Sequence, residues 1–166
     1  VSSYYNHLLN KYNRILKQRN NLLKDIQKNK SKREMLEIWN KQIITTGSKI
    51  IKKRIDVINK LKILARLNQR KITEGRENLS IEYDCSLTGD INKTKNIEEI
   101  FNKDLVNNYE RELNRGYTIF GPHRDDLIFN INGKDVRKYG SQGQQRTVAL
   151  ALKLAELEYM KSETGE

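Results

Sequence analysis

An apolar repeat near the start of the sequence restricts this part of the chain to long helices. Over residues 4–28, apolar side chains recur at alternating steps of three and four, with Arg19 as the polar exception; this is the pattern of a coiled-coil seam. A second apolar stripe runs from Leu36 to Leu67 and predicts a helix over residues 32–72. Because only polar residues 28–32 separate the two stripes, we expect an antiparallel helical hairpin.

Two residue types predict local features of the second helix. Ser31 is expected to cap it, since Glu34 follows at capping-box spacing. Gly47 is expected to mark a kink or a break. A helix of about 40 residues extends some 60 Å at about 1.5 Å per residue, so part of it should project or meet another chain.

After residue 77 the pattern changes to mixed strands and helices. Residues 79–87 alternate apolar and polar side chains and predict a strand. Residues 97–114 carry a helical stripe that Gly116 ends. Two further strands are expected at 117–120 and 127–130.

The C-terminal part predicts a hairpin and a buried helix. Asn132 and Gly133 form a type I′ turn signal leading into residues 135–138. Residues 144–161 are apolar on nearly every side, so this helix should be buried, in part by protein surface outside this chain. The predicted fold class is α+β, with a long helical hairpin attached to a small sheet.

Positive charge is concentrated in the predicted hairpin. The chain has 32 Lys and Arg against 21 Asp and Glu, and residues 1–76 hold 20 of the basic and 5 of the acidic residues. Such asymmetry indicates a polyanionic partner such as DNA; the alternative is a solvated helix coated in Lys for solubility. The candidate DNA-binding residues are Lys11, Arg14, Lys17, Arg19, Lys49, Lys52, Lys53 and Arg54.

Several classes of protein are excluded by composition. No run approaches the roughly 18 apolar residues that a membrane helix needs, and residues 1–14 lack the design of a secretory signal. The lone Cys85 excludes an internal disulfide and fits a reducing cytoplasm. No Cys/His zinc pattern is present. The start at Val1 instead of Met and the abrupt end at Glu166 suggest an excised fragment.

Two segments are candidates for nucleotide or phosphate chemistry. A P-loop pattern and an acidic-ended Walker B strand are both missing from the sequence, so this chain alone is not expected to bind and cleave ATP. In YGSQGQQRT, residues 139–147, Ser141 is placed to cap the last helix, and Gly140 and Gly143 allow close approach of backbone. The start of that helix is a candidate anion site; the alternative is a plain Ser-capped helix.

A second segment, GPHRDDLIF, places four ionisable groups in one turn before a strand. These are His123, Arg124, Asp125 and Asp126. They are candidates for a carboxylate metal site or an Arg–phosphate contact; alternatively, an Asp pairs with Arg124 or caps the turn. Without a third oxygen ligand, no metal is expected.

GPHRDD, the hairpin NGKDVRKY and the stretch from GSQGQQRT to Glu166 together resemble the RecF family of bacterial DNA replication and repair proteins. The resemblance is dense over residues 117–166 and agrees in plan over residues 1–116. It implies a basic helical-hairpin arm at 1–76, and at 77–166 part of an ABC-type ATPase head related to that of SMC proteins. It also implies a Walker A loop before Val1 and a Walker B strand after Glu166.

The resemblance assigns roles to the signature motif Ser141, Gln142, Gly143, Gln144 and Gln145. In a head-to-head homodimer this motif would complete the ATP site of the opposite protomer. Ser141 would bond the γ-phosphate through its hydroxyl and Gly143 through its N–H, with Gln144 and Gln145 bracing the helix start. Where Gly140 stands the family more often has Ser, a mild loss. The GPHRDD turn is expected to be structural and to contribute to the nucleotide or dimer surface.

The function implied is that of an ATP-dependent DNA-binding protein of the cytoplasm. It would use ATP and Mg²⁺ and act in repair, recombination, replication and the SOS response. It would recognise single-stranded gaps or their duplex junctions and help recombinases load there, with mediators of the RecR and RecO type. The intact protein would be a weak DNA-dependent ATPase. The alternatives are an ATP-independent coiled-coil interaction module and an SMC-like chromosome organiser, whose arms are far longer.

Overall fold

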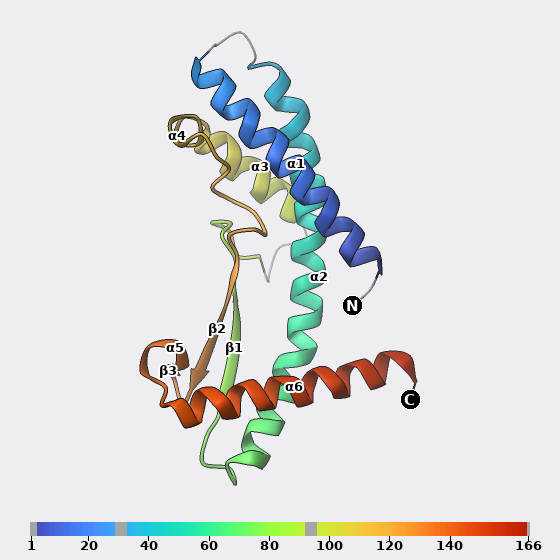
Figure 1. Cartoon of the computed structure of the whole chain (residues 1–166), viewed down its shortest axis with the longest axis vertical. Helices are drawn as coiled ribbons and strands as arrows, with labels where there is room; N and C mark the ends of the chain where they lie inside the picture. The colour runs from blue at the N-terminus through green and yellow to red at the C-terminus, as the bar shows by residue number, and fades with distance from the viewer. Residues whose placement is uncertain (1–2, 29–32, 92–95, 166) are drawn as a thin grey trace. The chain divides into compact units, whose positions relative to one another are not determined.

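The computed structural model describes residues 3–28, 33–91 and 96–165. Figure 1 labels six helices and three strands in this part of the chain. The helices are α1 (Ser3–Lys28), α2 (Met35–Ile72), α3 (Ile97–Asn107), α4 (Tyr109–Arg115), α5 (Val136–Tyr139) and α6 (Gln142–Thr164). The strands are β1 (Leu79–Asp84), β2 (Asp126–Ile131) and β3 (Lys134–Asp135). Among the described helices, none combines the length and the apolar character needed to cross a membrane.

Two compact units are present, and each is assembled from two separate stretches of sequence. The first contains residues 1–53 and 85–125, and the second contains residues 54–84 and 126–166. The helix α2 runs through residue 53 without interruption and so contributes to both. The packing units therefore do not coincide with the predicted division at residue 76, because residues 85–125 pack with the hairpin.

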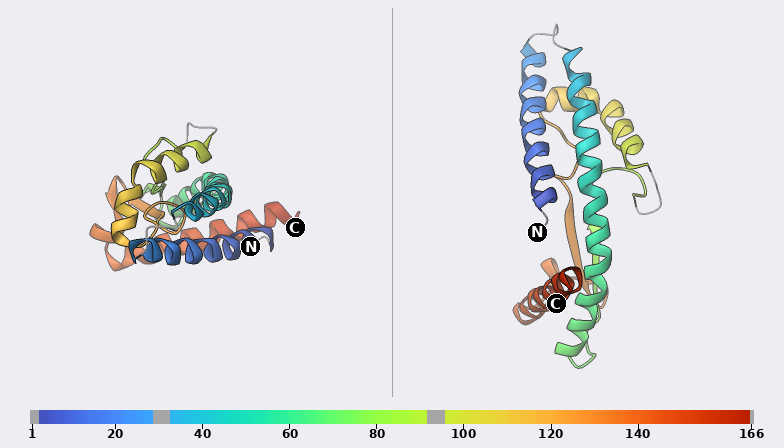
Figure 2. Two further views of the ribbon diagram at one scale, coloured as in Figure 1. Left: turned by 90° about the horizontal axis from the view of Figure 1, so that it is seen from above. Right: turned by 90° about the vertical axis from the view of Figure 1, so that its right-hand side faces the viewer.

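The first unit confirms the predicted antiparallel hairpin. The views in Figure 2 show α1 beside the first part of α2, with the two helices running in opposite directions. Their apolar stripes bury Leu22, Leu23 and Leu36 together with Leu113 of α4, and Trp39 packs against this cluster. The expected Ser31 cap lies outside the described residues.

Gly47 serves close packing, and the predicted break is absent, because α2 is helical through this residue. A Cβ atom at Gly47 would lie 2.7 Å from Cε1 of the Phe101 ring and 3.1 Å from Cε2 of Tyr12. The missing side chain therefore lets the aromatic rings of α3 and α1 approach the helix backbone.

The buried ion pair between Arg19 and Glu112 links α1 to α4. The guanidinium Nη2 lies 2.5 Å from Glu112 Oε2, and both side chains are almost fully buried. Arg19 also donates to the Oγ1 of Thr118 at 2.7 Å and to the Oδ1 of Asn40 at 2.8 Å. The polar exception in the coiled-coil seam is thus satisfied inside the unit.

Residues 117–120 do not form the predicted strand. The N–H of Thr118 donates to the side chain of Asn20 at 2.8 Å, and the N–H of Ile119 donates to Glu112 at 2.9 Å. Side chains thus take the backbone donors that a neighbouring strand would need. The predicted helix at 97–114 is also divided into α3 and α4 at Asn108, whereas the expected end at Gly116 is confirmed by a left-handed φ of 70°.

The second unit contains a three-stranded antiparallel sheet in the order β1-β2-β3. Leu79 pairs with Ile131 at one end of the β1–β2 ladder, and Asp84 pairs with Asp126 at the other. The predicted Asn132–Gly133 turn is confirmed, since both residues have positive φ. After β3, however, the chain forms α5 instead of a longer strand, because the Asp135 carboxylate caps it by accepting from the N–H groups of Arg137 and Lys138.

The C-terminal helix α6 packs on this sheet through one side. Ala151, Ala155 and Val148 join Ile81 of β1 and Ala65 of α2 in one apolar core. The opposite side remains exposed at Leu150, Leu154, Leu157 and Met160. The expected burial of the helix is therefore met on one side within the described residues, and the small residues face the core.

Candidate functional site

The signature segment forms a capping box at the start of α6. The hydroxyl of Ser141 accepts a hydrogen bond from the N–H of Gln144 at 3.2 Å. In return, the side-chain oxygen of Gln144 accepts from the N–H of Ser141 at 3.0 Å. The predicted cap is confirmed, and two of the unpaired donors at the helix start are satisfied reciprocally.

Glu77 braces this cap from the connection between α2 and β1. Its carboxylate accepts a hydrogen bond from the side-chain amide of Gln144 at 3.0 Å. It also accepts one from the amide of Gln69 at 2.7 Å, and the same Gln69 nitrogen lies 3.2 Å from the hydroxyl of Thr147. The start of α6 is thereby held to the last turns of α2 by a charged acceptor.

The outer face of the signature segment is open to solvent. Ser141, Gln142, Gly143 and Gln145 are all exposed. The Ser141 oxygen is an acceptor in the cap, so its O–H remains a donor that can rotate outward. A Cβ atom at Gly143 would lie 3.8 Å from its nearest neighbour, the Ser141 Oγ. An anion could therefore approach both the hydroxyl and the backbone of the first helical turn.

Gly140 has a steric role directly before this segment. A Cβ atom there would lie 2.5 Å from the carbonyl oxygen of Val136, which is backbone and cannot move easily. A Ser at this position would thus require a shift of the loop. Gln145 ties the same residue down by donating to the Gly140 carbonyl at 3.3 Å.

The GPHRDD turn is held by internal contacts in the first unit up to Asp125. His123 lies between two partners: Nδ1 is 2.8 Å from the Tyr12 hydroxyl, and Nε2 is 3.1 Å from the carbonyl of Thr118. Since a carbonyl only accepts, Nε2 carries the proton and Tyr12 donates to Nδ1. Burial is the main cause that lowers the pKa of His123 below its ordinary value.

The other three ionisable residues of the turn point to different partners. Arg124 lies over the ring of Tyr117, 5.1 Å from its centroid. Asp125 accepts from the N–H of Ser86 at 2.8 Å. Asp126 begins β2, and its pKa is lowered chiefly by the hydrogen bond from Arg137 at 2.6 Å. Among the described residues, no group of three or more His, Cys, Asp and Glu side chains is arranged to hold a metal ion.

The basic candidates divide into exposed residues and one buried residue. Lys11, Arg14, Lys17, Lys49, Lys52 and Lys53 are exposed, and Arg54 is partly buried. Arg19 is fully buried against Glu112, so its assignment as a DNA contact is wrong. Sequence reasoning placed it with the surface charges because its partner lies far along the chain.

Sequence reasoning also missed one groove and the two residues, Glu77 and Gln69, that hold the signature segment in place. Glu77 and Gln69 carry no local motif, and only the fold brings them to the signature segment. The groove lies between α1 and α2 and is lined by His7, Asn10, Lys11, Arg14, Ile15, Gln18, Trp39 and Gln42. Its signal in the sequence is the placement of polar residues on α1 beside the coiled-coil seam.

The curated relatives and solved structures that resemble this chain match it over its whole length or nearly so. The chain is 58% identical over 170 residues to the DNA replication and repair protein RecF of Halothermothrix orenii. It is 47% identical over 169 residues to that of Staphylococcus carnosus. Each alignment covers 100% of this chain and 45% of the relative, so the chain spans less than half the length of these proteins. No protein-family model matches the chain.

Solved structures give the same result for the fold. A structure of the recombination mediator protein RecF with ATP, from the RecFOR pathway, matches with a TM-score of 0.92 at 37% identity. The match covers 100% of this chain and 44% of that one. A second RecF structure, described as RecF-ATPrS, also has a TM-score of 0.92, at 38% identity. The predicted hairpin with part of an ABC-type head is therefore confirmed as a fold.

Proposed function

This chain belongs to the RecF family, and from that premise we propose that it is the central part of an ATP-dependent DNA-binding protein of replication and repair. The intact protein would use ATP with Mg²⁺ in the cytoplasm as a weak DNA-dependent ATPase. It would act in recombination and the SOS response by helping recombinases load at single-stranded gaps, together with mediators of the RecO and RecR type.

ATP would join two heads, and each signature segment would complete the nucleotide site of the other protomer. Ser141 would donate its hydroxyl, and Gly143 its N–H, to the γ-phosphate. Gln144 and Gln145 would hold the helix start, and the turn from His123 to Asp126 would support the head surface. Hydrolysis would then separate the protomers.

The observation that carries this proposal is the open face at the start of α6. Glu77 holds the side chain of Gln144 by a hydrogen bond, while Ser141 and Gly143 remain exposed to solvent. A helix start that served only as a cap would not need an exposed glycine at its second residue, where Ala is the better helix former. The match to an ATP-bound RecF structure supports the same assignment.

DNA binding is assigned to the exposed basic residues of the predicted arm at 1–76. These are Lys11, Arg14, Lys17, Lys49, Lys52 and Lys53, with the partly buried Arg54. Binding led by phosphate contacts would weaken steeply with salt. An affinity that does not change between low and moderate salt would contradict this electrostatic account.

The decisive experiment uses Ser141→Arg and Ser141→Asp in the full-length protein. Arg blocks the face by size, whereas Asp keeps a capping oxygen and adds a negative charge beside the γ-phosphate. Both variants should bind ATP normally but fail to form ATP-dependent dimers in sedimentation velocity. Ser162→Arg, at the exposed far end of the same helix, is the matched control. Dimerisation that survives both changes at Ser141 would favour an ATP-independent interaction module instead.

A further inference from the structure

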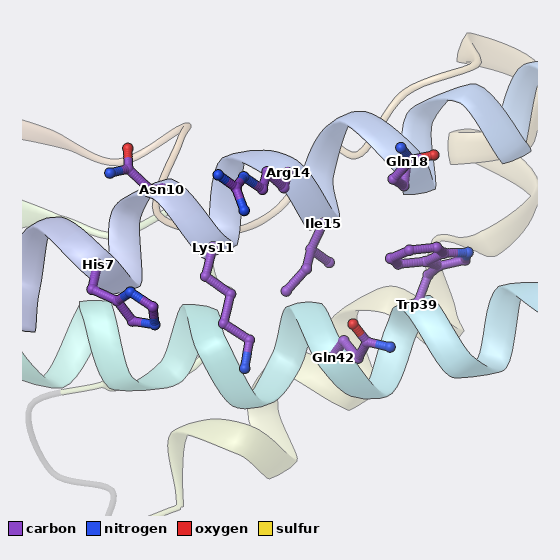
Figure 3. A pocket seen from close by; sticks show the side chains of 8 residues that line it. All are labelled: His7, Asn10, Lys11, Arg14, Ile15, Gln18, Trp39 and Gln42. Atoms are coloured by element: carbon purple, nitrogen blue, oxygen red, sulfur yellow. The ribbon is translucent and has the colours of Figure 1, made fainter.

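We propose that the groove between α1 and α2 binds a single strand of DNA and that Trp39 stacks on one of its bases. This inference rests on the proposed DNA-binding function and specifies where one strand is held. Figure 3 shows the eight lining side chains, six from α1 and two from α2.

The charge of the groove suits a phosphate backbone. Lys11 and Arg14 line it together with His7, and none of the eight lining residues is acidic. Both basic side chains are exposed, and neither is paired with a carboxylate among the described residues. Their charge is therefore available to an external anion, which distinguishes them from the buried and paired Arg19.

The length of the groove suits several nucleotides. From His7 to Gln18 the lining runs along α1 over about 16 Å, at about 1.5 Å per residue. Even at the stacked-duplex rise of about 3.4 Å per phosphate, this length spans at most about five phosphates, and an extended single strand would place fewer along it. The amides of Gln18 and Gln42 add donors and acceptors for sugar and base edges.

The indole of Trp39 selects a single strand over a duplex. This ring lies in the groove opposite Gln18 and above Gln42 (Figure 3), and its side chain is half-buried. It packs against the core of the hairpin, so its position is fixed before any ligand binds. Bases in a duplex are already stacked on each other, whereas those of a single strand can stack on an aromatic ring beside a basic groove. An acidic peptide would use Lys11 and Arg14 without requiring the ring.

The test measures binding of the full-length protein to a labelled oligothymidylate, a blunt duplex and a polyglutamate peptide. Trp39→Leu keeps an apolar side chain but cannot stack, and Trp39→Phe restores an aromatic ring. Leu should weaken binding of the single strand by about fivefold to a hundredfold, while Phe should restore most of it and duplex binding should stay unchanged. Ultraviolet crosslinking of a bromodeoxyuridine strand should label the peptide that contains Trp39.

The charge arm of the test uses Lys11→Glu with Arg14→Glu. This variant should bind the single strand more weakly and with a salt dependence smaller by about two phosphate contacts. Lys28→Glu, about 21 Å along α1 from Arg14 and beyond the Debye length of about 10 Å, is the control. Circular dichroism checks that all variants keep their helices.

Four results would overturn the inference. They are an unchanged single-strand affinity in Trp39→Leu, an equal loss for the duplex, crosslinks confined to other peptides, and polyglutamate binding that depends on the same residues. Each leaves the proposed function in place if the wild type binds DNA and dimerises with ATP. If the wild type binds no DNA at all, both the groove and the proposed DNA-binding function fail together.

Discussion

The carboxylate of Glu77 accepts a hydrogen bond from the side-chain amide of Gln144 at 3.0 Å. Because the oxygen of that amide already accepts from the N–H of Ser141, both polar atoms of Gln144 are engaged. The orientation of the signature segment thus depends on a residue that precedes β1, and Gln69 connects the same carboxylate to α2. This chain of contacts gives the first prediction.

Replacing Glu77 with Ala should loosen the start of α6 without unfolding the sheet. Each hydrogen bond to a charged group contributes about 1.5–3 kcal/mol, and the amide of the buried Gln69 would lose its charged partner. Hydrogen exchange should show faster exchange at the amides of residues 144–147, and ATP-dependent dimerisation should weaken. Glu158→Ala, at an exposed position of the same helix, should alter neither. Unchanged protection in Glu77→Ala would show that the brace is dispensable.

Gly143→Ala should separate helix stability from dimerisation. A Cβ atom there meets no atom closer than 3.8 Å, and Ala favours a helix by up to about 1 kcal/mol over Gly. The melting temperature should therefore stay the same or rise slightly, while the added methyl group obstructs the partner's nucleotide and dimerisation falls. Gly140→Ala should behave differently and lower the melting temperature, because its Cβ would lie 2.5 Å from the Val136 carbonyl. Full dimerisation by Gly143→Ala would argue against close approach of a phosphate.

Breaking the pair of Arg19 and Glu112 should destabilise the first unit strongly. Removal of one partner from a buried ion pair costs about 3–5 kcal/mol, because the other charge stays buried without compensation. Arg19→Met and Glu112→Gln should each shift urea unfolding accordingly, followed by circular dichroism. The double variant should cost less than the two single changes combined. Additive costs would mean that the two groups do not interact.

Stability should fall in mild acid because of His123. Burial lowers the pKa of this imidazole in the folded state, so the unfolded chain takes up the proton first as pH falls. The stabilisation is present above the ordinary pKa of about 6.5 and is lost as pH falls through the lower folded value. His123→Gln retains a donor for Thr118 and an acceptor for Tyr12 but does not titrate. Its melting temperature should depend less on pH between neutral and mildly acidic buffer, and an unaltered slope would assign the acid sensitivity elsewhere.

The elements with local signals were predictable from the sequence. The stripes of α1 and α2, the alternation of β1, the Asn132–Gly133 turn and the Ser141 cap each depend on residues close together in the chain. Short-range periodicity and turn chemistry are sufficient for such features. The signature motif was found in the same way, and the family resemblance supplied its proposed role.

The features that escaped prediction depend on distant partners. Residues 117–120 have the composition of a strand, but Asn20 and Glu112 take their backbone donors. From the sequence alone, Arg19 is interpreted as a surface charge, and only the fold shows its contact with Glu112. Gly47 is likewise interpreted as a helix breaker, and only the fold shows Phe101 packed against it. In each case the deciding contact is made by a residue that no local pattern identifies.

The interleaving of the two compact units restricts how this polypeptide can be dissected. The backbone passes from one unit to the other after residues 53, 84 and 125. A stop codon after residue 76 would thus yield a hairpin without the helices that carry Phe101 and Glu112. The part of α2 that belongs to the second unit would have no sheet to pack on. A gene fragment that ends there should yield a protease-sensitive product, whereas a shortened version that retains both stretches of either unit would need a designed linker.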